Sequence, residues 1–544
     1  MLGHEGVGLP WSACTARHLV DHVIQSCERN PGSPLLIFDD GLVVSRETFL
    51  ELCNDFGAYL APRVRPGDRV AVAVRNRAEF MIAMIAIAAN RAIMVSINPG
   101  GMPADVGHIL RDSTPVLLIV EKQNVDTFQE ITKGLGPLTE VICLADDEPY
   151  ALPSCRSTDG PFDLRDAHCE PDDITSIFYT SGTTGRPKGC MISHTWWLRM
   201  VDVDLRLLPF GRERAMCSVP FYYADPAAYL MIALQAGGSL IAARRFSLSR
   251  YWDIVHEFDV TKIHAIASIP ILLAKAPPHP LERKHQVHHA TSVAVPQQFH
   301  QTLVERFGFP WIDCYGSTET GRISQIPWAM RDEMIGSGSI GFPVPGTELC
   351  ILAENGSLVS PGEIGEAAVR TPGMFNGYFN QPELTAQVMR RGFYLTGDLV
   401  RQDESGALFF AGRKKDIIRR SGENISAAEV EAVLRELAGI KDAAVVPVPD
   451  VIRGEEVKAF ILLGEGVDED QVPPEMIMNH CLSRLSKYKS VRYIEYWSQE
   501  FPHTPSMRVD KNQLKAKSNA YGNVVWDVEN AIFGITGPVR PAKT

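Results

Sequence analysis

The chain has 544 residues, of which 45% are hydrophobic and 22% are charged, and its formal net charge is −12. These are values of a globular protein, and the length predicts about two to four domains. An acidic chain lacks the basic surface that nucleic acids and anionic membranes require, so we expect neither as a partner.

The first residues and the cysteines indicate the cellular compartment of the protein. Met1–Glu5 contains no basic segment followed by an apolar run, so no secretory signal is predicted. The longest apolar stretch, Phe80–Ala89, falls short of the ~18–20 residues that cross a bilayer and predicts a buried helix. The 11 cysteines include no Cys-x-x-Cys pair, which is typical of reduced thiols. We therefore expect a cytoplasmic location.

The part of the chain before residue 171 alternates strand-like and helix-like segments. Arg69–Val74, Ile93–Ile97 and Val116–Val120 have β character, with the apolar helix between the first two. Strands that alternate with helices predict parallel βαβ layers. Leu144–Pro171 is acidic and contains prolines, so it is interpreted as a long surface connection.

A loop rich in glycine and hydroxyl groups follows the strand-like run Ile174–Tyr179. From Tyr179 to Gly189 it reads Tyr-Thr-Ser-Gly-Thr-Thr-Gly-Arg-Pro-Lys-Gly. Its glycines permit a close approach to a ligand, and its N–H and hydroxyl groups can donate to one anion. Lys188 follows proline and precedes glycine, so the spacing is not that of a Walker A loop. Both a phosphate cradle and a solvated loop fit this composition. The candidate cradle residues are Thr180, Ser181, Gly182, Thr183, Thr184 and Lys188.

The segment after this loop continues the layered pattern. Ala215–Pro220 and Ser239–Ala243 are predicted strands, and Ala227–Gln235 is a predicted helix between them. Ile263–Leu272 indicates another transition from strand to helix. The aromatic run Phe221–Tyr223 follows Pro220, and packing in a core and lining of a cavity both remain open for it.

The residue pattern of the sequence changes after Gly336. Ile340–Gly346 and Gly365–Arg370 are short strands punctuated by glycine and proline, which predicts a small antiparallel β subdomain. Ser426 and Glu429 have the spacing of a capping box, which predicts the start of a helix. Strands at 443–448 and 457–463 and a helix near 474–486 then predict a separate α+β domain.

Further motifs follow the glycine-rich loop in sequence. Asp313–Thr320 reads Asp-Cys-Tyr-Gly-Ser-Thr-Glu-Thr, and Tyr394–Asp398 reads Tyr-Leu-Thr-Gly-Asp. Gly412–Asp416 reads Gly-Arg-Lys-Lys-Asp, and Ser421–Ser426 reads Ser-Gly-Glu-Asn-Ile-Ser. Each alone is compatible with a turn, a surface ion pair or a loop. Together, in this order, they resemble the signature motifs of the adenylate-forming superfamily, in its acyl-CoA ligase branch, over nearly the whole chain.

The resemblance implies an α/β fold. It consists of a large layered αβαβα-type N-terminal domain with a small β subdomain, and a small mobile α+β C-terminal domain. The expected boundaries are residues 1–412 for the N-terminal domain, 413–416 for a hinge that includes Lys415, and 417–517 for a C-terminal lid. Residues 518–544 form a tail that carries no interpretation.

The resemblance also implies roles for particular residues. In the family the aromatic ring at Tyr315 stacks on adenine, Thr318 touches phosphate, and Glu319 holds Mg²⁺, here together with Thr184. Asp398 and Arg413 match the residues that bind ribose, and Gly422 matches the glycine that the thiol approaches. The implied catalytic residues are Lys188, Glu319, Gly422 and Arg508, and the remaining implied nucleotide contacts are Asp313, Gly316 and Ser317.

The implied reaction has two halves. A carboxylate attacks the α-phosphorus of ATP to give acyl-AMP, and a thiol then attacks the acyl carbonyl and expels AMP. We expect CoA as the thiol, because no carrier domain follows in the chain, and Mg²⁺ as the metal. The aromatic residues suggest an apolar acyl group, and Asp225 is interpreted either as a contact to a polar substituent or as a helix cap. The expected acyl-binding residues are Trp197, Tyr222, Tyr223 and Asp225.

Two positions depart from the family pattern. The family has Pro-x-Thr-x-x-Gly-Lys where Pro502–Arg508 reads Pro-His-Thr-Pro-Ser-Met-Arg, so Arg508 replaces the catalytic lysine. Arginine keeps the charge but is a planar fork, and the loss of one well-aimed donor costs on the order of 10²–10³ in rate. Lys511 is a nearby substitute outside the matched position. In Thr291–Pro296, Val293 occupies a glycine-like place against adenine.

Three functional hypotheses follow. In the first, adenylation is weak or absent, and the enzyme makes thioesters from acyl-adenylate that a separate adenylating enzyme supplies. In the second, Arg508 replaces lysine adequately and the enzyme is a complete ATP-dependent ligase. In the third, the chain is a non-catalytic sensor of nucleotide or acyl-adenylate.

Overall fold

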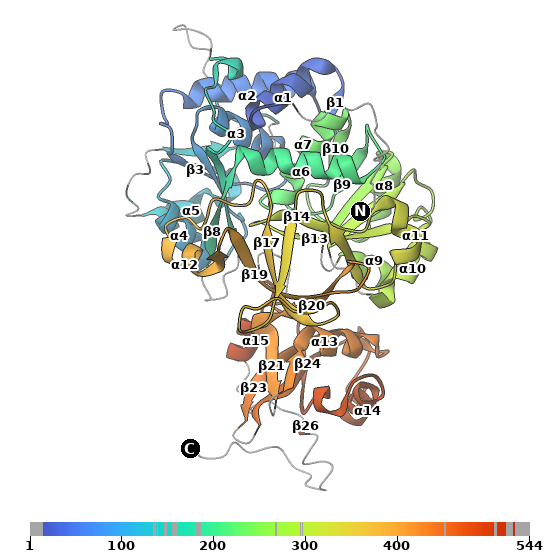
Figure 1. Cartoon of the computed structure of the whole chain (residues 1–544). Helices are drawn as coiled ribbons and strands as arrows, with labels where there is room; N and C mark the ends of the chain where they lie inside the picture. Colours follow the sequence, from blue (N-terminus) through green and yellow to red (C-terminus); the bar gives the residue numbers. More distant parts are fainter. Residues whose placement is uncertain are drawn as a thin grey trace. The chain divides into compact units, whose positions relative to one another are not determined.

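The chain forms two compact units of mixed α/β structure (Figure 1). The first comprises Met1–Leu349 and Val369–Tyr394, and the second comprises Cys350–Ala368 and Leu395–Thr544. The predicted boundaries at residues 412 and 417 stay predictions, because this division follows compactness and not motion. The computed structural model describes residues 15–133, 136, 138, 140–145, 149–154, 162–180, 187–266, 269–293, 295, 297–420, 423–450, 453–504, 509–517 and 526–527.

The first unit contains a six-stranded sheet. Its strands are parallel except for the last pair, which is an antiparallel hairpin. In order across the sheet they are β6 (Glu140–Leu144), β5 (Leu117–Glu121), β3 (Arg69–Ala73), β4 (Ile93–Ser96), β7 (Ile174–Thr180) and β8 (Lys188–Ser193).

A second sheet runs through the rest of this unit. Its strands from β1 to β13 are parallel, and antiparallel strands flank them on both sides. The order is β2 (Val43–Ser45), β1 (Pro34–Phe38), β10 (Ser239–Ala242), β9 (Arg214–Cys217), β11 (Lys262–Ile266), β12 (His289–Val293), β13 (Trp311–Ser317), β14 (Gly321–Gln325) and β15 (Ser339–Pro343).

Helices cover both faces of the first sheet. Val70 and Val72 of β3 pack into the main core, whereas Ala71 and Ala73 of the same strand pack into a second core. Alternate residues of a strand point to opposite faces, so both faces of this sheet are buried, as parallel sheets require. The helices of the first unit are α1 (Leu19–Arg29), α2 (Arg46–Leu60), α3 (Ala78–Ala89), α4 (Pro103–Ser113), α5 (Val125–Thr132), α6 (His194–Leu207), α7 (Ala224–Ala236), α8 (Tyr251–Glu257), α9 (Ile269–Lys275), α10 (Gln297–Phe307), α11 (Arg331–Met334) and α12 (Pro382–Val388).

Helix α3 confirms the prediction of a buried helix. Every residue from Ala78 to Ala89 is buried, and α3 packs against α1 and α2. A helix that is apolar on all sides belongs inside the fold. No helix within the described ranges is long and apolar enough to cross a membrane.

The β subdomain and the C-terminal α+β domain follow. Strand β24 lies between β21 and β25, and β23 pairs with it along ten residues from Asp450 to Ile440. The strands are β16 (Glu348–Leu352), β17 (Ile364–Arg370), β18 (Met389–Arg390), β19 (Phe393–Gln402), β20 (Leu408–Arg413), β21 (Ile417–Arg420), β22 (Glu423–Ser426), β23 (Ile440–Asp450), β24 (Gly454–Leu463), β25 (Tyr493–Trp497) and β26 (Trp526–Asp527). The helices are α13 (Ala427–Glu436), α14 (Pro474–Arg484) and α15 (Lys511–Lys517).

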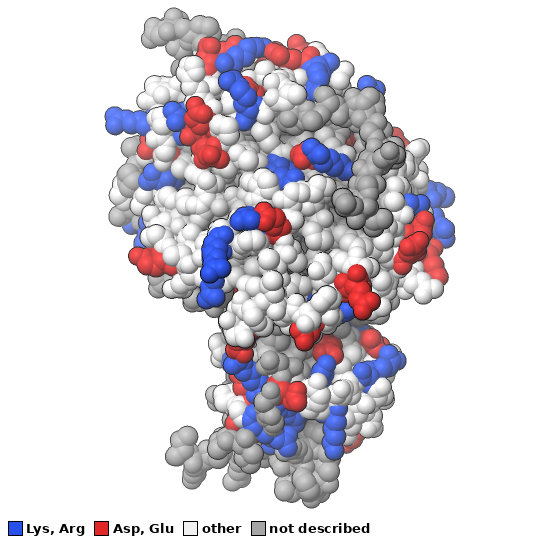
Figure 2. Space-filling model, in the orientation of Figure 1, with Lys and Arg blue, Asp and Glu red and all other residues white. Residues whose placement is uncertain are grey.

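Charged side chains of both signs lie interspersed on the face seen in Figure 2.

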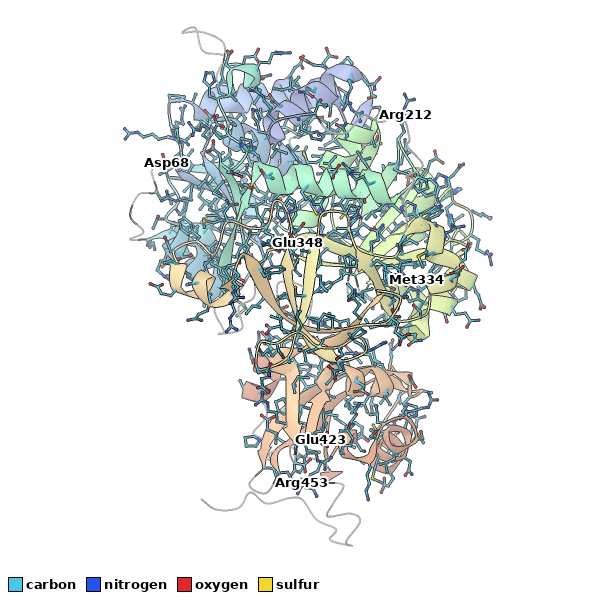
Figure 3. The ribbon with its side chains drawn as sticks, viewed as in Figure 1. Asp68, Arg212, Met334, Glu348, Glu423 and Arg453 are labelled. Carbon is cyan, nitrogen blue, oxygen red and sulfur yellow. The ribbon has the colours of Figure 1, made fainter. Side chains whose placement is uncertain are left out.

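Buried ion pairs of arginine stabilise the second unit from within. Arg453, in the turn between β23 and β24 (Figure 3), donates to Glu456 at 2.8 Å, and Arg420 lies 2.8 Å from the same carboxylate. Glu456 is fully buried, so these partners compensate its loss of hydration.

Two local predictions were wrong. Strand β9 ends at Cys217, three residues before the predicted end at Pro220. Helix α13 begins after Ser426 as expected, but the Ser426 hydroxyl makes no capping bond. Glu429 instead pairs with Lys489 at 2.7 Å, so the capping box does not form.

We expect Gly341→Ala to destabilise the first unit. A Cβ atom at Gly341 would lie 1.9 Å from the carbonyl carbon of Gln325, at a φ of +85°. Gly67 has the same φ with open space around it, so Gly67→Ala measures the backbone strain alone. Gly341→Ala should cost about 1–3 kcal/mol more than Gly67→Ala in urea unfolding, because the strand must shift. Equal losses would contradict the close approach of the two strands.

Candidate functional site

The glycine-rich loop joins the two strands of the β7–β8 hairpin. Thr180 pairs with Lys188 and Tyr179 with Gly189, so these residues form the base of the loop. The Tyr179 hydroxyl donates to Asp112 at 2.6 Å and fixes the end of β7. The predicted cradle residues Ser181, Gly182, Thr183 and Thr184 lie outside the described residues.

Gly189 is required by a close approach of the chain. A Cβ atom there would lie 2.8 Å from Ile177 and 3.3 Å from Phe379. The backbone N–H of Phe379 donates to the carbonyl of Gly189 at 2.7 Å. The segment Phe375–Phe379 therefore lies directly against strand β8.

The same segment contacts the motif that follows β13. The N–H of Phe375 donates to the carbonyl of Glu319 at 2.8 Å, and the hydroxyl of Tyr378 donates to the Glu319 carboxylate at 2.8 Å. The ammonium of Lys188 lies 4.3 Å from the centre of the Tyr378 ring. Tyr378 thus contacts two of the predicted catalytic residues, Lys188 and Glu319.

 Lys188 and Glu319 themselves lie 131 positions apart along the chain, and Tyr378 is a contact that sequence reasoning did not single out.

Burial, together with the charge of Glu319, raises the pKa of Tyr378. The hydroxyl is therefore protonated near neutral pH and acts as a donor to the carboxylate. The signal in the sequence was weak, since Gly377-Tyr378 resembles an ordinary turn before helix α12.

The turn between β13 and β14 presents Glu319. Gly316 lies where a Cβ atom would come within 2.2 Å of the Gly321 carbonyl oxygen, so only glycine fits. The N–H of Ser317 donates to the Thr320 hydroxyl at 3.2 Å and closes the turn. Tyr315 is buried at the end of β13, and Thr318 is half-buried. Their predicted contacts to adenine and phosphate stay predictions.

Asp313 has a supporting position within the core. Its carboxylate accepts from the N–H of Val295 at 2.9 Å and lies 2.6 Å from the ring of His300. Both side chains are buried. The side chain therefore holds the segment around Val295, and a nucleotide contact of Asp313 stays a prediction.

The two predicted ribose residues meet in the second unit. Asp398 on β19 pairs with Arg413 on β20 in the strand register, and the guanidinium lies 2.9 Å from the carboxylate. Lys415 lies in the short helical turn Lys414–Asp416, where the hinge was predicted. Gly422, Met507 and Arg508 lie outside the described residues.

Lys511, the possible substitute for the missing lysine, already has partners. Its ammonium lies 2.7 Å from Glu431 and 3.9 Å from Asp416. All three residues belong to the second unit, so these ion pairs form within one compact body.

The predicted acyl-binding residues separate into two groups. Trp197 is fully buried, and its indole N–H donates to Thr175 at 2.9 Å, so we leave it out of the acyl-binding set. Tyr222 and Tyr223 are half-buried with ring centres 4.9 Å apart. Asp225 lies in the first turn of α7, with Tyr223 as the N-cap residue, and it keeps 40% of its side chain exposed.

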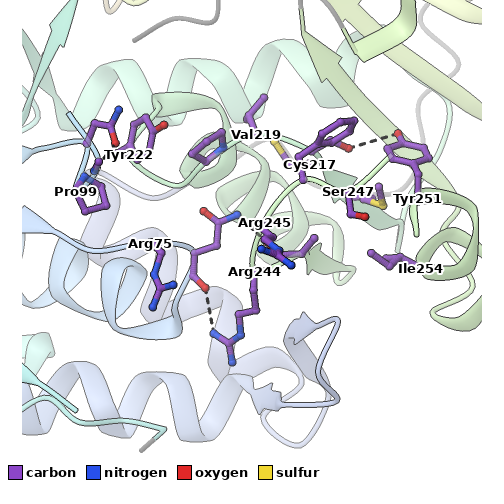
Figure 4. Close-up of a pocket in the computed structure, with 18 of the residues that line it drawn as sticks. Arg75, Pro99, Cys217, Val219, Tyr222, Arg244, Arg245, Ser247, Tyr251 and Ile254 are labelled. Atoms are coloured by element: carbon purple, nitrogen blue, oxygen red, sulfur yellow. Dashed lines mark hydrogen bonds between the residues drawn. The ribbon is translucent and has the colours of Figure 1, made fainter. Parts of the chain in front are cut away.

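A pocket of about 440 Å³ opens beside Tyr222 (Figure 4). Its apolar wall includes Val219 and Ile254, and Arg244 and Arg245 also line it. Arg244 is held by Asp40 at 2.8 Å. Arg245 is exposed, and within the described part of the chain its guanidinium has no hydrogen bond or ion pair.

Glu319 is the predicted ligand of Mg²⁺. Among the described residues, no group of three or more His, Cys, Asp or Glu side chains could hold a metal ion. Mg²⁺ usually binds through one or two carboxylates together with substrate phosphates and water. Glu319 beside Lys188 fits that mode and does not fit a metal site built from protein groups alone.

Comparison with known proteins accounts for this arrangement. The sequence model of AMP-binding enzymes matches residues 23–379, and that of their C-terminal domain matches residues 429–508. The chain belongs to the AMP-binding enzyme family. The predicted membership of the adenylate-forming superfamily, in its acyl-CoA ligase branch, is thereby confirmed.

Relatives of this AMP-binding enzyme have names that agree with the family. The crotonobetaine/carnitine–CoA ligase of Escherichia coli O157:H7 is 29% identical over 513 residues, which cover 88% of this chain and 95% of that relative. The protein of the same name from Salmonella agona is 30% identical, with 83% and 89% covered. The o-succinylbenzoate CoA synthetase of Bacillus subtilis, solved with its acyl-adenylate intermediate, has a TM-score of 0.79 at 25% identity, with 91% and 97% covered. The protein is an enzyme of the acyl-CoA ligase type.

We expect Tyr378→Phe to weaken the binding of ATP in the presence of Mg²⁺. The change keeps the ring beside Lys188 and removes the donor that fixes the Glu319 carboxylate. Loss of an outer partner of a metal ligand typically costs about 10–100-fold. Calorimetric titration with and without Mg²⁺ measures the effect, which should be absent without the metal.

Tyr59→Phe is the matched control for this change. Tyr59 also donates to a glutamate, Glu140. Glu140 belongs to β6, which lies at the opposite edge of the six-stranded sheet from the β7–β8 hairpin. Equal affinities of Tyr378→Phe and the unchanged enzyme would refute the positioning role.

Proposed function

We propose that this enzyme forms acyl-CoA thioesters through an acyl-adenylate, and that adenylation is its weaker half-reaction. The observation that carries the proposal is the contact of Lys188 and Glu319 with one side chain, Tyr378. It places a cation and a carboxylate together at the base of the glycine-rich loop. Such a pair suits positioning and charge neutralisation of a phosphoryl centre.

In this proposal Lys188 binds phosphate oxygens and Glu319 holds Mg²⁺, which would neutralise charge on the nucleotide. The second half needs less help from the protein, because a mixed anhydride is already activated. Orientation of the thiol then matters more than a strong base. The family and the names of its relatives support ATP and CoA as cosubstrates.

The weakness of adenylation is argued from Arg508. Arginine replaces the lysine of the family motif, and a planar fork does not reproduce a compact point donor. Lys511 does not offer a ready replacement, because its ammonium is paired with Glu431 at 2.7 Å. A replacement would have to break that pair first.

The test compares two substrate sets on one purified protein. One set is a panel of carboxylic acids with ATP and CoA, and the other is the matching synthetic acyl-adenylates with CoA. We expect acyl-CoA from the adenylates and little or none from the acids. Arg508→Lys should raise the ATP-dependent rate by about 10²–10³-fold, because a compact donor returns to the phosphate.

Lys511→Gln is the companion variant and should leave both rates unchanged. Equal product from both substrate sets in the unchanged enzyme would mean a complete ligase and would overturn the weak-adenylation proposal. Nucleotide binding with no product from either set would favour the non-catalytic sensor.

We further propose that the arginine-lined pocket binds the phosphates of CoA. It combines apolar walls with the unpaired guanidinium of Arg245, and Tyr222 also lines it. CoA is an elongated thiol with an anionic end, so its apolar and charged parts match those of the pocket. Strand β4 pairs with β7, which leads into the glycine-rich loop, and Asn98, two residues beyond β4, lines the pocket.

We expect Arg245→Gln to raise the KM for CoA by about tenfold, because one charge-assisted hydrogen bond to phosphate is lost. The KM for pantetheine, which has no phosphate, should not change. Thioester formation from a synthetic acyl-adenylate measures both constants. Arg390→Gln, which removes another exposed arginine of the same unit, is the control. An unchanged KM for CoA would place the phosphates elsewhere.

A further inference from the structure

Asp313 uses both oxygens of its carboxylate inside the core of the first unit. Oδ1 accepts from the N–H of Val295 at 2.9 Å, and Oδ2 lies 2.6 Å from Nε2 of His300. The side chain of Asp313 is 4% exposed, and that of His300 is fully buried. Two bare acceptors would repel one another at this distance, so a hydrogen lies between Nε2 and Oδ2. The carboxylate is therefore held from two sides.

The two partners of Asp313 lie close together in the chain, where β12 leads into α10. Strand β12 ends at Val293, so Val295 lies in the connection and His300 lies in the first turn of the helix. The register of β12 with β13 also ends at Val293. Beyond that point, the N–H of Val295 has a side chain as its acceptor and not the backbone of β13. The Asp313 carboxylate thus fastens the connection at both of its ends.

The buried pair of His300 and Asp313 does not contribute mainly to stability. Burial raises the pKa of Asp313, although His300 and the N–H of Val295 both lower it, so these partners do not fully offset the cost of burial. Buried pairs of this kind are often no more stabilising than apolar side chains of the same volume. Within the described part of the chain, Nδ1 of His300 has no hydrogen-bond partner. What the pair supplies is a fixed position for the segment that it fastens.

That segment lies where the base of a nucleotide is expected. Asp313 precedes Tyr315 by two residues on β13, and side chains two residues apart on a strand share a face of the sheet. The family resemblance places adenine against the ring of Tyr315 and against the turn that follows β12. The hydrogen bond from Val295 to Asp313 therefore links the two walls that the base would meet.

We propose that His300 is a positioning residue for the base of the nucleotide, because it holds the Asp313 carboxylate, which in turn holds the segment around Val295. The proposal rests on the proposed function, since it requires that the enzyme binds ATP and acyl-adenylate through their adenine. Without His300, Oδ2 loses its partner and the carboxylate is free to turn away from Val295. The wall against the base then loosens, whereas the phosphate contacts of Lys188 do not depend on it.

The test is calorimetric titration of the full-length enzyme with ATP and with inorganic triphosphate, which has no base, each with Mg²⁺. His300→Leu should weaken the binding of ATP by about tenfold, the size of one lost buried hydrogen bond, and should leave the binding of triphosphate unchanged. His300→Gln, whose amide N–H can take the place of Nε2–H, should bind ATP as the unchanged enzyme does. His300→Asn is too short to reach the carboxylate, and it replaces His300→Leu with the same expected loss if that variant does not fold.

His289→Leu is the matched control. His289 is also a fully buried histidine, and it lies at the other end of β12. Among the residues that the structure describes, neither of its ring nitrogens has a hydrogen-bond partner. The change should therefore leave the binding of both ATP and triphosphate as it is.

Unchanged binding of ATP in folded His300→Leu or His300→Asn, or an equal loss for ATP and triphosphate, would overturn the proposal. An equal loss of ATP binding in His300→Gln or in His289→Leu would overturn it as well, and so would a lack of ATP binding by the unchanged enzyme. Acyl-CoA formation from synthetic acyl-adenylates is measured separately. Binding of ATP that depends on His300, without any acyl-CoA from the unchanged enzyme, would refute the proposed function and leave the positioning role standing.

Discussion

The core of the first unit depends on the ion cluster of Asp204, Lys262 and Arg322. Burial alone would raise the pKa of Asp204, but the two cations lower it, so the carboxylate stays charged inside the fold. The cluster connects helix α6 to strands β11 and β14. Removal of one member would leave an unpaired buried charge, which typically costs several kcal/mol, on the order of 3–5.

The catalytic region depends on contacts between distant parts of the chain. Strand β8 supplies Lys188, and the turn after β13 supplies Glu319. The segment Phe375–Phe379 touches both through backbone and side-chain hydrogen bonds. Backbone hydrogen bonds anchor Phe375 on one side of Tyr378 and Phe379 on the other. Tyr378 therefore has little freedom to rotate away from the Glu319 carboxylate. The orientation of Glu319 is therefore set before any nucleotide binds.

The elements and the motifs could be predicted from the sequence to different extents. Apolar runs such as Phe80–Ala89 and the strands β3 to β5 carry local signals, and the structure agrees with them within a residue or two. The loop and the glutamate could be found because each lies in a contiguous motif. Tyr378 could not, since its partners are far away in sequence and its own surroundings resemble an ordinary turn.

Burial also decided cases that composition left open. Trp197 was predicted to bind the acyl group, but its full burial and its hydrogen bond to Thr175 place it in the core. Ser426 and Glu429 have the spacing of a capping box, but Lys489 attracts the glutamate from another part of the unit. Pairwise contacts of this kind depend on the tertiary fold and leave no mark in a short stretch of sequence.

The stability of the fold does not explain why its core is charged. Replacement of a buried ion cluster by well-packed apolar residues is often neutral or stabilising, by about 1–4 kcal/mol. A charged core that only filled space would therefore gain nothing over leucine or methionine. The cluster extends into a longer polar network, because Arg322 donates to the hydroxyl of Tyr229 and the hydroxyls of Tyr229 and Thr291 each lie 3.1 Å from Nδ1 of His264. The network joins helices α6 and α7 to strands β11, β12 and β14, so it specifies which elements of the core meet.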